Sequence, residues 1–129
     1  MSSAKASIAE MPRGGPQASW LDRRLQTDTL EYTDRYDIPD AIKQQVVSEL
    51  DRLGVRRGFH EKFAQLALEQ VAGIAEPRIL ELGAGHGKLS QEILRRHRGA
   101  RVTVSDLDPA SVTNIGAGPL GDEPRAEVK

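Results

Sequence analysis

The sequence predicts an α/β protein in which a doubly wound parallel sheet follows a helical N-terminal segment. Only 4% of the 129 residues are aromatic, so a core must consist mainly of Leu, Ile, Val and Ala, as in helix-rich and α/β proteins. Apolar residues at three-and-four spacing dominate residues 20–74, which indicates helices. Two short apolar runs, 79–82 and 102–104, then enclose a glycine-rich loop and one helical pattern. This order predicts two parallel strands joined by a right-handed crossover.

Two amphipathic helices are expected before the first strand. Pro39, between two aspartates, is typical of a helix start because acidic residues suit the positive end of the helix dipole. The apolar stripe of this helix continues to Leu53, and we expect Gly54 to end it. A second helix is expected from Phe59 to near Gly73. We therefore divide the chain into three parts. A flexible leader rich in Ser, Ala, Gly and Pro covers residues 1–17, a helical segment covers 18–76, and the first part of the sheet domain covers 77–129.

The sheet domain is expected to hold three strands. Residues 78–82 are apolar at positions on both faces, which is typical of a strand buried on both sides of a parallel sheet. After the second strand, Asp108 and Pro109 predict a helix start with Asp108 as its cap. Residues 127–129 predict a third strand.

Composition excludes several classes of function. The 18 Lys and Arg residues nearly balance the 19 Asp and Glu residues, so the formal net charge of −1 indicates neither nucleic-acid binding nor an anionic membrane surface. Cysteine is absent and the three histidines are not closely paired, so no transition-metal site is expected. The lack of cysteine suits a reducing compartment. The sequence shows no apolar stretch long enough to span a membrane and no signal peptide. We expect a cytoplasmic protein.

A glycine-rich loop and an acidic residue point to a nucleoside-containing cofactor. Residues 83–87 (GAGHG) follow the first strand, where glycines allow a ligand to approach the main chain. Asp106 comes 23 residues after Gly83, at the carboxyl end of the second strand, where open α/β sheets bind ligands. A carboxylate there can accept hydrogen bonds from both hydroxyls of a ribose.

Spacing separates three kinds of glycine loop. A phosphate-binding loop is excluded because Leu82 stands at its first glycine and Leu89 at its hydroxyl position. A dinucleotide fingerprint, G-x-G-x-x-G, fits at Gly83 and Gly85 but places Lys88 at the third glycine, so it is the alternative. The pattern of an acidic residue, an apolar residue and G-x-G-x-G fits at every position from Glu81.

With these motifs, RILELGAGHG and VTVSDLDP, the chain resembles the class I S-adenosylmethionine-dependent methyltransferases over about residues 57–129. The resemblance implies a Rossmann-like domain and S-adenosyl-L-methionine as the cofactor. It implies that the loop glycines form a bed for the methionine part, that Glu81 orients the loop and the ligand's amino end, that Asp106 binds the ribose diol and that Leu107 lies near the adenine. The cofactor-binding residues expected from it are Glu81, Gly83, Ala84, Gly85, Gly87, Asp106 and Leu107.

The resemblance also implies the rest of the function. We expect methyl transfer to an unidentified acceptor, with a small molecule favoured, by a chain that holds the N-terminal portion of the domain and needs a segment after Lys129 for activity. An unpaired sheet edge is expected to allow self-association. No catalytic residue is named, and His86 is taken as structural because the family admits many residues there. An NAD(P)-binding Rossmann protein and a non-catalytic interaction module with a vestigial nucleotide-binding fold are the alternatives.

Overall fold

The structure is a computed structural model that describes residues 17–25 and 29–129. All but the last residue of the predicted leader, 1–17, lies outside the described residues. The chain divides into two units, Met1–Glu31 and Tyr32–Lys129. In the first unit, helix α2 (Trp20–Leu25) has a reciprocal cap: the Asp22 amide donates to Ser19 Oγ, and the Ser19 amide donates to the Asp22 carboxylate.

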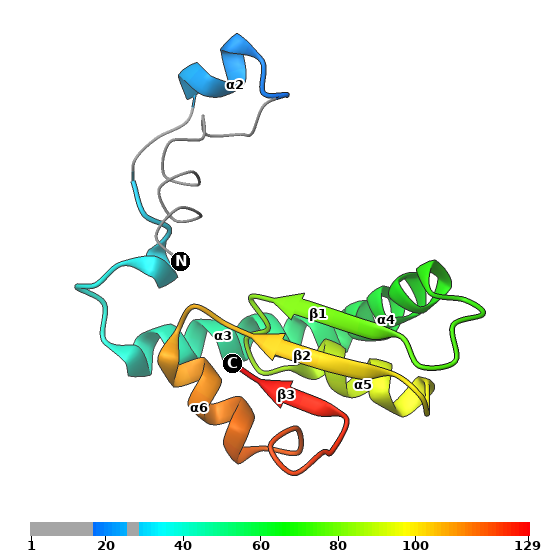
Figure 1. Cartoon of the computed structure of the whole chain (residues 1–129). Coiled ribbons are helices and arrows are strands. Elements are labelled where there is room, and N and C mark those ends of the chain that lie inside the picture. Colours follow the sequence, from blue (N-terminus) through cyan, green and yellow to red (C-terminus); the bar gives the residue numbers. More distant parts are fainter. Residues whose placement is uncertain (1–16, 26–28) are drawn as a thin grey trace, which may run out of the picture. The chain divides into compact units, whose positions relative to one another are not determined.

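The second unit is an α/β fold with a three-stranded parallel sheet (Figure 1). Its strand order is β1-β2-β3, with Arg78 opposite Arg101 and Val102 opposite Ala126. This confirms the predicted fold class, a parallel sheet interleaved with helices and preceded by N-terminal helices. The elements in chain order are η1 (Tyr32–Asp34), α3 (Asp40–Arg57), α4 (Phe59–Gln70), β1 (Arg78–Leu82), α5 (Lys88–Arg96), β2 (Arg101–Ser105), α6 (Pro109–Ala117) and β3 (Ala126–Val128).

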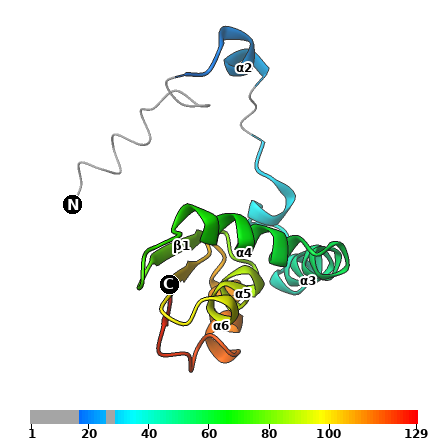
Figure 2. The ribbon, with the colours of Figure 1, turned by 90° about the vertical axis from the view of Figure 1, so that its right-hand side faces the viewer.

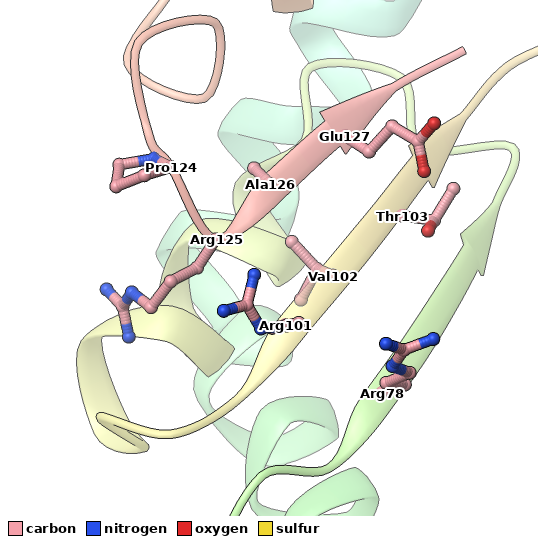
Figure 3. A pocket seen from close by; sticks show the side chains of 8 residues that line it. All are labelled: Arg78, Arg101, Val102, Thr103, Pro124, Arg125, Ala126 and Glu127. Atoms are coloured by element: carbon pink, nitrogen blue, oxygen red, sulfur yellow. The ribbon is translucent and has the colours of Figure 1, made fainter.

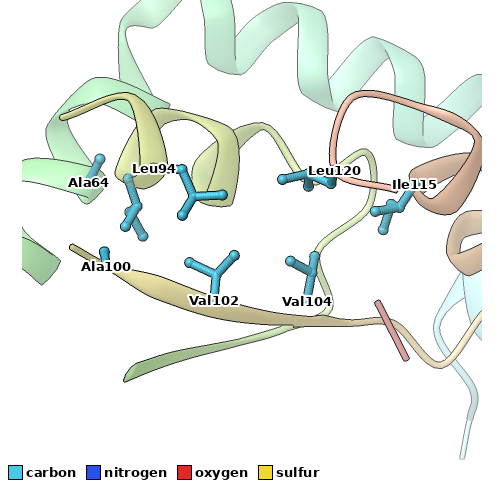
Figure 4. Packing of buried hydrophobic residues seen from close by; sticks show 8 residues of the cluster. Ala64, Leu94, Ala100, Val102, Val104, Ile115 and Leu120 are labelled. Carbon is cyan, nitrogen blue, oxygen red and sulfur yellow. The ribbon is translucent and has the colours of Figure 1, made fainter. Parts of the chain in front are cut away.

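The core lies between the sheet and the helices on one side of it (Figures 2 and 4). Val102 and Val104 of β2 point toward these helices, as Figure 4 shows. None of the core residues is aromatic, as the aliphatic composition of the sequence predicts. They are Ala64, Ile93, Leu94, Ala100, Val102, Val104, Ile115 and Leu120.

Strand β1 is present as predicted, but the expectation that both its faces are buried is wrong. Its residues alternate between exposed and half-buried, and Leu80 and Leu82 are 60% and 75% exposed. The reason is the sequential strand order, since right-handed crossovers then place α5 and α6 on the same face. Ile79 and Glu81 face the helices, whereas the two leucines lie on the face that these helices leave uncovered.

Gly54 does not end α3, which continues to Arg57. The helix ends because Gly58 adopts a left-handed conformation with φ of 64° and donates its amide back to the last turn. Gly54 instead provides room for a side chain of the next helix, since a Cβ there would lie 2.7 Å from His60 Nε2. The glycine at 54 therefore serves helix packing.

Candidate functional site

The glycine-rich loop folds back over the carboxyl end of β2. The Ala84 amide donates to the Ser105 carbonyl at 3.0 Å, and the Gly87 amide donates to the Ala84 carbonyl at 2.8 Å. Gly83, Gly85 and Gly87 all have positive φ, between 58° and 72°, a region that other residues enter only with strain. The loop therefore makes a tight turn between β1 and α5, as its sequence predicts.

Asp106 is joined to this loop. Its Oδ2 accepts a 2.8 Å hydrogen bond from the Gly85 amide, and its Oδ1 accepts a 2.9 Å bond from the Asp108 amide. The side chain is half-buried at the end of β2. Each carboxylate oxygen has two lone pairs, so both oxygens retain the capacity to accept a hydroxyl from a ligand.

The three loop glycines have different surroundings. A Cβ added to Gly83 would meet no atom within 4 Å, so this position is open to a ligand. A Cβ on Gly85 would lie 3.2 Å from Val47 of α3. A Cβ on Gly87 would lie 2.6 Å from Leu120, inside the core, so packing already explains the glycine at this position.

Glu81 ties β1 to the start of α5. The amide and hydroxyl of Ser90 both donate to Glu81 Oε2. Burial raises the pKa of Glu81 above its ordinary value, although the hydrogen bonds from Ser90 and the charge of His60 act to lower it; the nearby charge of Asp106 adds to the rise. Glu81 thus connects the strand before the loop to the helix after it.

Helix α3 is attached to the site through Gln44, which the sequence analysis did not single out. Gln44 Nε2 donates to Asp108 Oδ2 at 2.8 Å and to Ser111 Oγ at 2.9 Å, and Gln44 Oε1 accepts from Asn114 Nδ2 at 2.8 Å. Asp108 also accepts from the Ala110 amide, so its predicted role as the cap of α6 is confirmed. No local pattern could reveal Gln44, because its partners lie 64 to 70 residues away.

A hollow of about 380 Å³ lies beside the loop, lined by Gln44, Ser48, His86 and Asn114. These four side chains come from α3, the glycine loop and α6, and none of them carries a formal charge with His86 neutral. The volume is within the range of small-molecule pockets.

His86 also lies against an acidic side chain of α3. Its Nδ1 is 3.8 Å from Asp51 Oδ2, and the other oxygen of the same carboxylate is 3.2 Å from His60 Nε2. All three side chains are half-buried. The fold thus places Asp51 between two imidazoles that are 26 residues apart in the sequence.

Leu107, the last residue of the predicted site, is 95% exposed beside Asp106. Its apolar surface is therefore free to lie against a flat ring. The structure brings Glu81, the loop and Asp106 together at one edge of the sheet, with Leu107 at the rim.

A second hollow, of about 250 Å³, lies near the amino ends of the strands (Figure 3). Arg78 and Arg101 stand side by side there on paired strands. Arg125, also in its lining, donates to Glu123 and to the carbonyls of Leu94 and His97 near the end of α5. This hollow is separate from the candidate cofactor site, because the glycine loop is at the opposite ends of the strands.

Comparison with protein-family models, curated proteins and solved structures finds no match to this chain. Within residues 17–25 and 29–129, no helix is long and apolar enough to cross a membrane. The same described residues hold no group of three or more His, Asp or Glu side chains arranged to bind a metal ion.

Proposed function

We propose that this chain binds S-adenosyl-L-methionine and forms the cofactor-binding part of a methyltransferase with an unidentified, small-molecule acceptor. The hydrogen bond between the Gly85 amide and Asp106 is the observation that carries the proposal. It joins the glycine loop and the acidic residue into one unit at the carboxyl ends of β1 and β2. Parallel α/β sheets bind nucleoside ligands at such an edge.

The residues at this edge fit the cofactor. Asp106 has lone pairs free for the two ribose hydroxyls, and charge-assisted bonds of this kind contribute about 1.5–3 kcal/mol each. Gly83 leaves the main chain open to the methionine part, and Leu107 offers an exposed apolar surface for the adenine. When bound, the cofactor supplies an electrophilic methyl group on a sulfonium. The chain's own contribution is to hold that group in line with the acceptor, which lowers the entropic part of the barrier.

An NAD(P)-binding protein is the second candidate, because it shares the parallel sheet and the acidic residue. The dinucleotide loop needs its third glycine for close packing of the helix against the strands. In this chain the tightly packed glycine is Gly87, whereas Lys88, at the dinucleotide position, is exposed. The packing therefore favours a loop of the G-x-G-x-G type over a dinucleotide loop. It supports S-adenosylmethionine, rather than NAD(P), as the ligand.

The test is an NMR titration of the chain with S-adenosylmethionine and, separately, with NAD, carried to millimolar concentration. We expect S-adenosylmethionine to perturb the amides of Gly83 to Gly87 and NAD to leave them unchanged. Asp106→Asn should weaken binding at least tenfold, or about 1.4 kcal/mol. Asp122→Asn, a matched change at an exposed aspartate, should not weaken it. Binding of NAD alone would favour the second candidate, and binding of neither would favour a non-catalytic module.

A further inference from the structure

The hollow beside the glycine loop has the chemistry of a site for an uncharged, protic ligand. Its lining consists of an amide from Gln44, the hydroxyl of Ser48, the imidazole of His86 and an amide from Asn114. Gln44 already uses its amide on Asp108, Ser111 and Asn114. Ser48, His86 and the side-chain carbonyl of Asn114 are therefore the lining groups with polar atoms for a ligand. With no lysine or arginine in the lining, the hollow does not favour an anion.

A carboxylate of α3 lies close to one ring nitrogen of His86. The Asp51 carboxylate lies 3.8 Å from Nδ1, which is beyond hydrogen-bond distance, and its negative charge favours the tautomer that carries the proton on Nδ1. The unprotonated Nε2 is then the nitrogen available to a ligand in the hollow. His60 Nε2, on α4, lies 3.2 Å from the other oxygen of Asp51 but makes no hydrogen bond to it. A carboxylate behind an imidazole is the arrangement by which enzymes orient a general base.

We infer that the hollow holds the methyl acceptor as an uncharged molecule with a hydroxyl or amine group, and that His86 Nε2 accepts its proton. This rests on the proposed function. In the step, the acceptor oxygen or nitrogen forms a bond to the methyl carbon while the bond from that carbon to the sulfonium breaks and leaves its electron pair on sulfur. The O–H or N–H bond breaks and its proton passes to His86 Nε2. Asp51 is a positioning residue, because it acts through His86.

Phenol and anisole are a matched pair of probes for this site, since they share a ring and differ by the proton that His86 would accept. In NMR titrations of the chain we expect phenol, but not anisole, to shift the Nε2 resonance of His86. Long-range ¹H–¹⁵N spectra should also show the Nδ1–H tautomer. Equal shifts of the His86 resonance with the two probes, or a His86 tautomer with its proton on Nε2, would overturn the inference. Both measurements use the unmodified chain.

Variants distinguish a specific role of His86 in phenol binding from a general effect of losing a histidine. His86→Phe should weaken phenol binding at least tenfold, whereas Asp51→Asn should weaken it about fivefold and shift the tautomer of His86. His97→Phe is the matched control, because Nδ1 of His97 is buried without a hydrogen-bond partner and its loss leaves no group unsatisfied. Unchanged phenol affinity in His86→Phe would contradict the assignment. If phenol binds through His86 but S-adenosylmethionine does not bind, the proposed function fails while the protic site remains.

Discussion

The amide of Gly85 donates a 2.8 Å hydrogen bond to Oδ2 of Asp106, a residue 21 positions further along the chain. This bond links the turn that follows β1 to the end of β2. Because Asp106 also accepts from the Asp108 amide, one side chain organises both the glycine loop and the start of α6.

Replacing Asp106 should therefore affect stability as well as ligand binding. Asp106→Ala leaves the amides of Gly85 and Asp108 without their acceptor, and we expect the free energy of unfolding to fall by about 1–3 kcal/mol. Urea denaturation measures this change, with Asp122→Ala as the exposed control. A variant as stable as the parent would show that water replaces these bonds at no cost.

Gln44 is expected to matter although it is remote from the loop in the sequence. Gln44→Ala removes the bonds to Asp108, Ser111 and Asn114, so the free energy of unfolding should fall by about 1–2 kcal/mol. The affinity for the proposed cofactor should fall severalfold. Gln45→Ala, an exposed change on the same helix, should alter neither. Denaturation and cofactor titration of the two variants test this, and equal behaviour would refute a positioning role.

Two loop glycines should respond differently to the same substitution. Both have positive φ, so an alanine at either position costs about 1 kcal/mol in backbone strain. Gly87→Ala also places a Cβ 2.6 Å from Leu120 Cδ1, and we expect about 2–4 kcal/mol of destabilisation in total. Gly83→Ala meets no such contact and should mainly weaken binding of the proposed cofactor. Thermal unfolding and titration distinguish the two; equal stability losses would contradict the packing argument.

Glu81 should make stability fall as pH rises. Because burial raises its pKa in the folded protein, the folded state binds more protons than the unfolded state between the ordinary pKa of 4.5 and the raised value. The free energy of unfolding therefore decreases as pH increases through this window. Glu81→Gln retains an oxygen for Ser90 but does not titrate, so its stability relative to the parent should increase from pH 4 to pH 7. Glu76→Gln, the same change at an exposed position, is the matched control for the denaturation measurements.

Glu92 should have the opposite pH dependence. Hydrogen bonds from Arg95 and then Arg96 lower its pKa from 4.5 to about 2, so its stabilisation is present above pH 4.5 and disappears as pH falls through about 2. The arginine partners are solvent-accessible, so we expect Glu92→Gln to cost only about 0.5–1 kcal/mol at neutral pH. Denaturation at pH 7 and pH 2 tests this: a cost that persists at pH 2 would rule out the ion pairs as its source.

Most elements of the sheet domain could be predicted from the sequence because their signals are local. The apolar run before the loop predicted β1, and the Asp108-Pro109 pair predicted the start of α6. The apolar spacing and the cap residues that predict these features lie within a few residues, although the hydrogen bonds of β1 go to β2, 23 residues away. The position of Asp106 at the end of β2 followed from the same strand pattern.

The tertiary structure alone decided which distant residues meet. Gln44 reaches Asp108, and Asp51 reaches His86, only because α3 packs beside the loop and α6. The exposure of Leu80 also depends on which face the crossover helices cover. Local patterns were enough to predict the strands, the tight loop and the capped helix, because apolar spacing, glycines and a cap residue are visible within a few positions of the chain. The contacts of α3 depend on the packing of whole elements, whose free energy is spread over residues far apart in the chain.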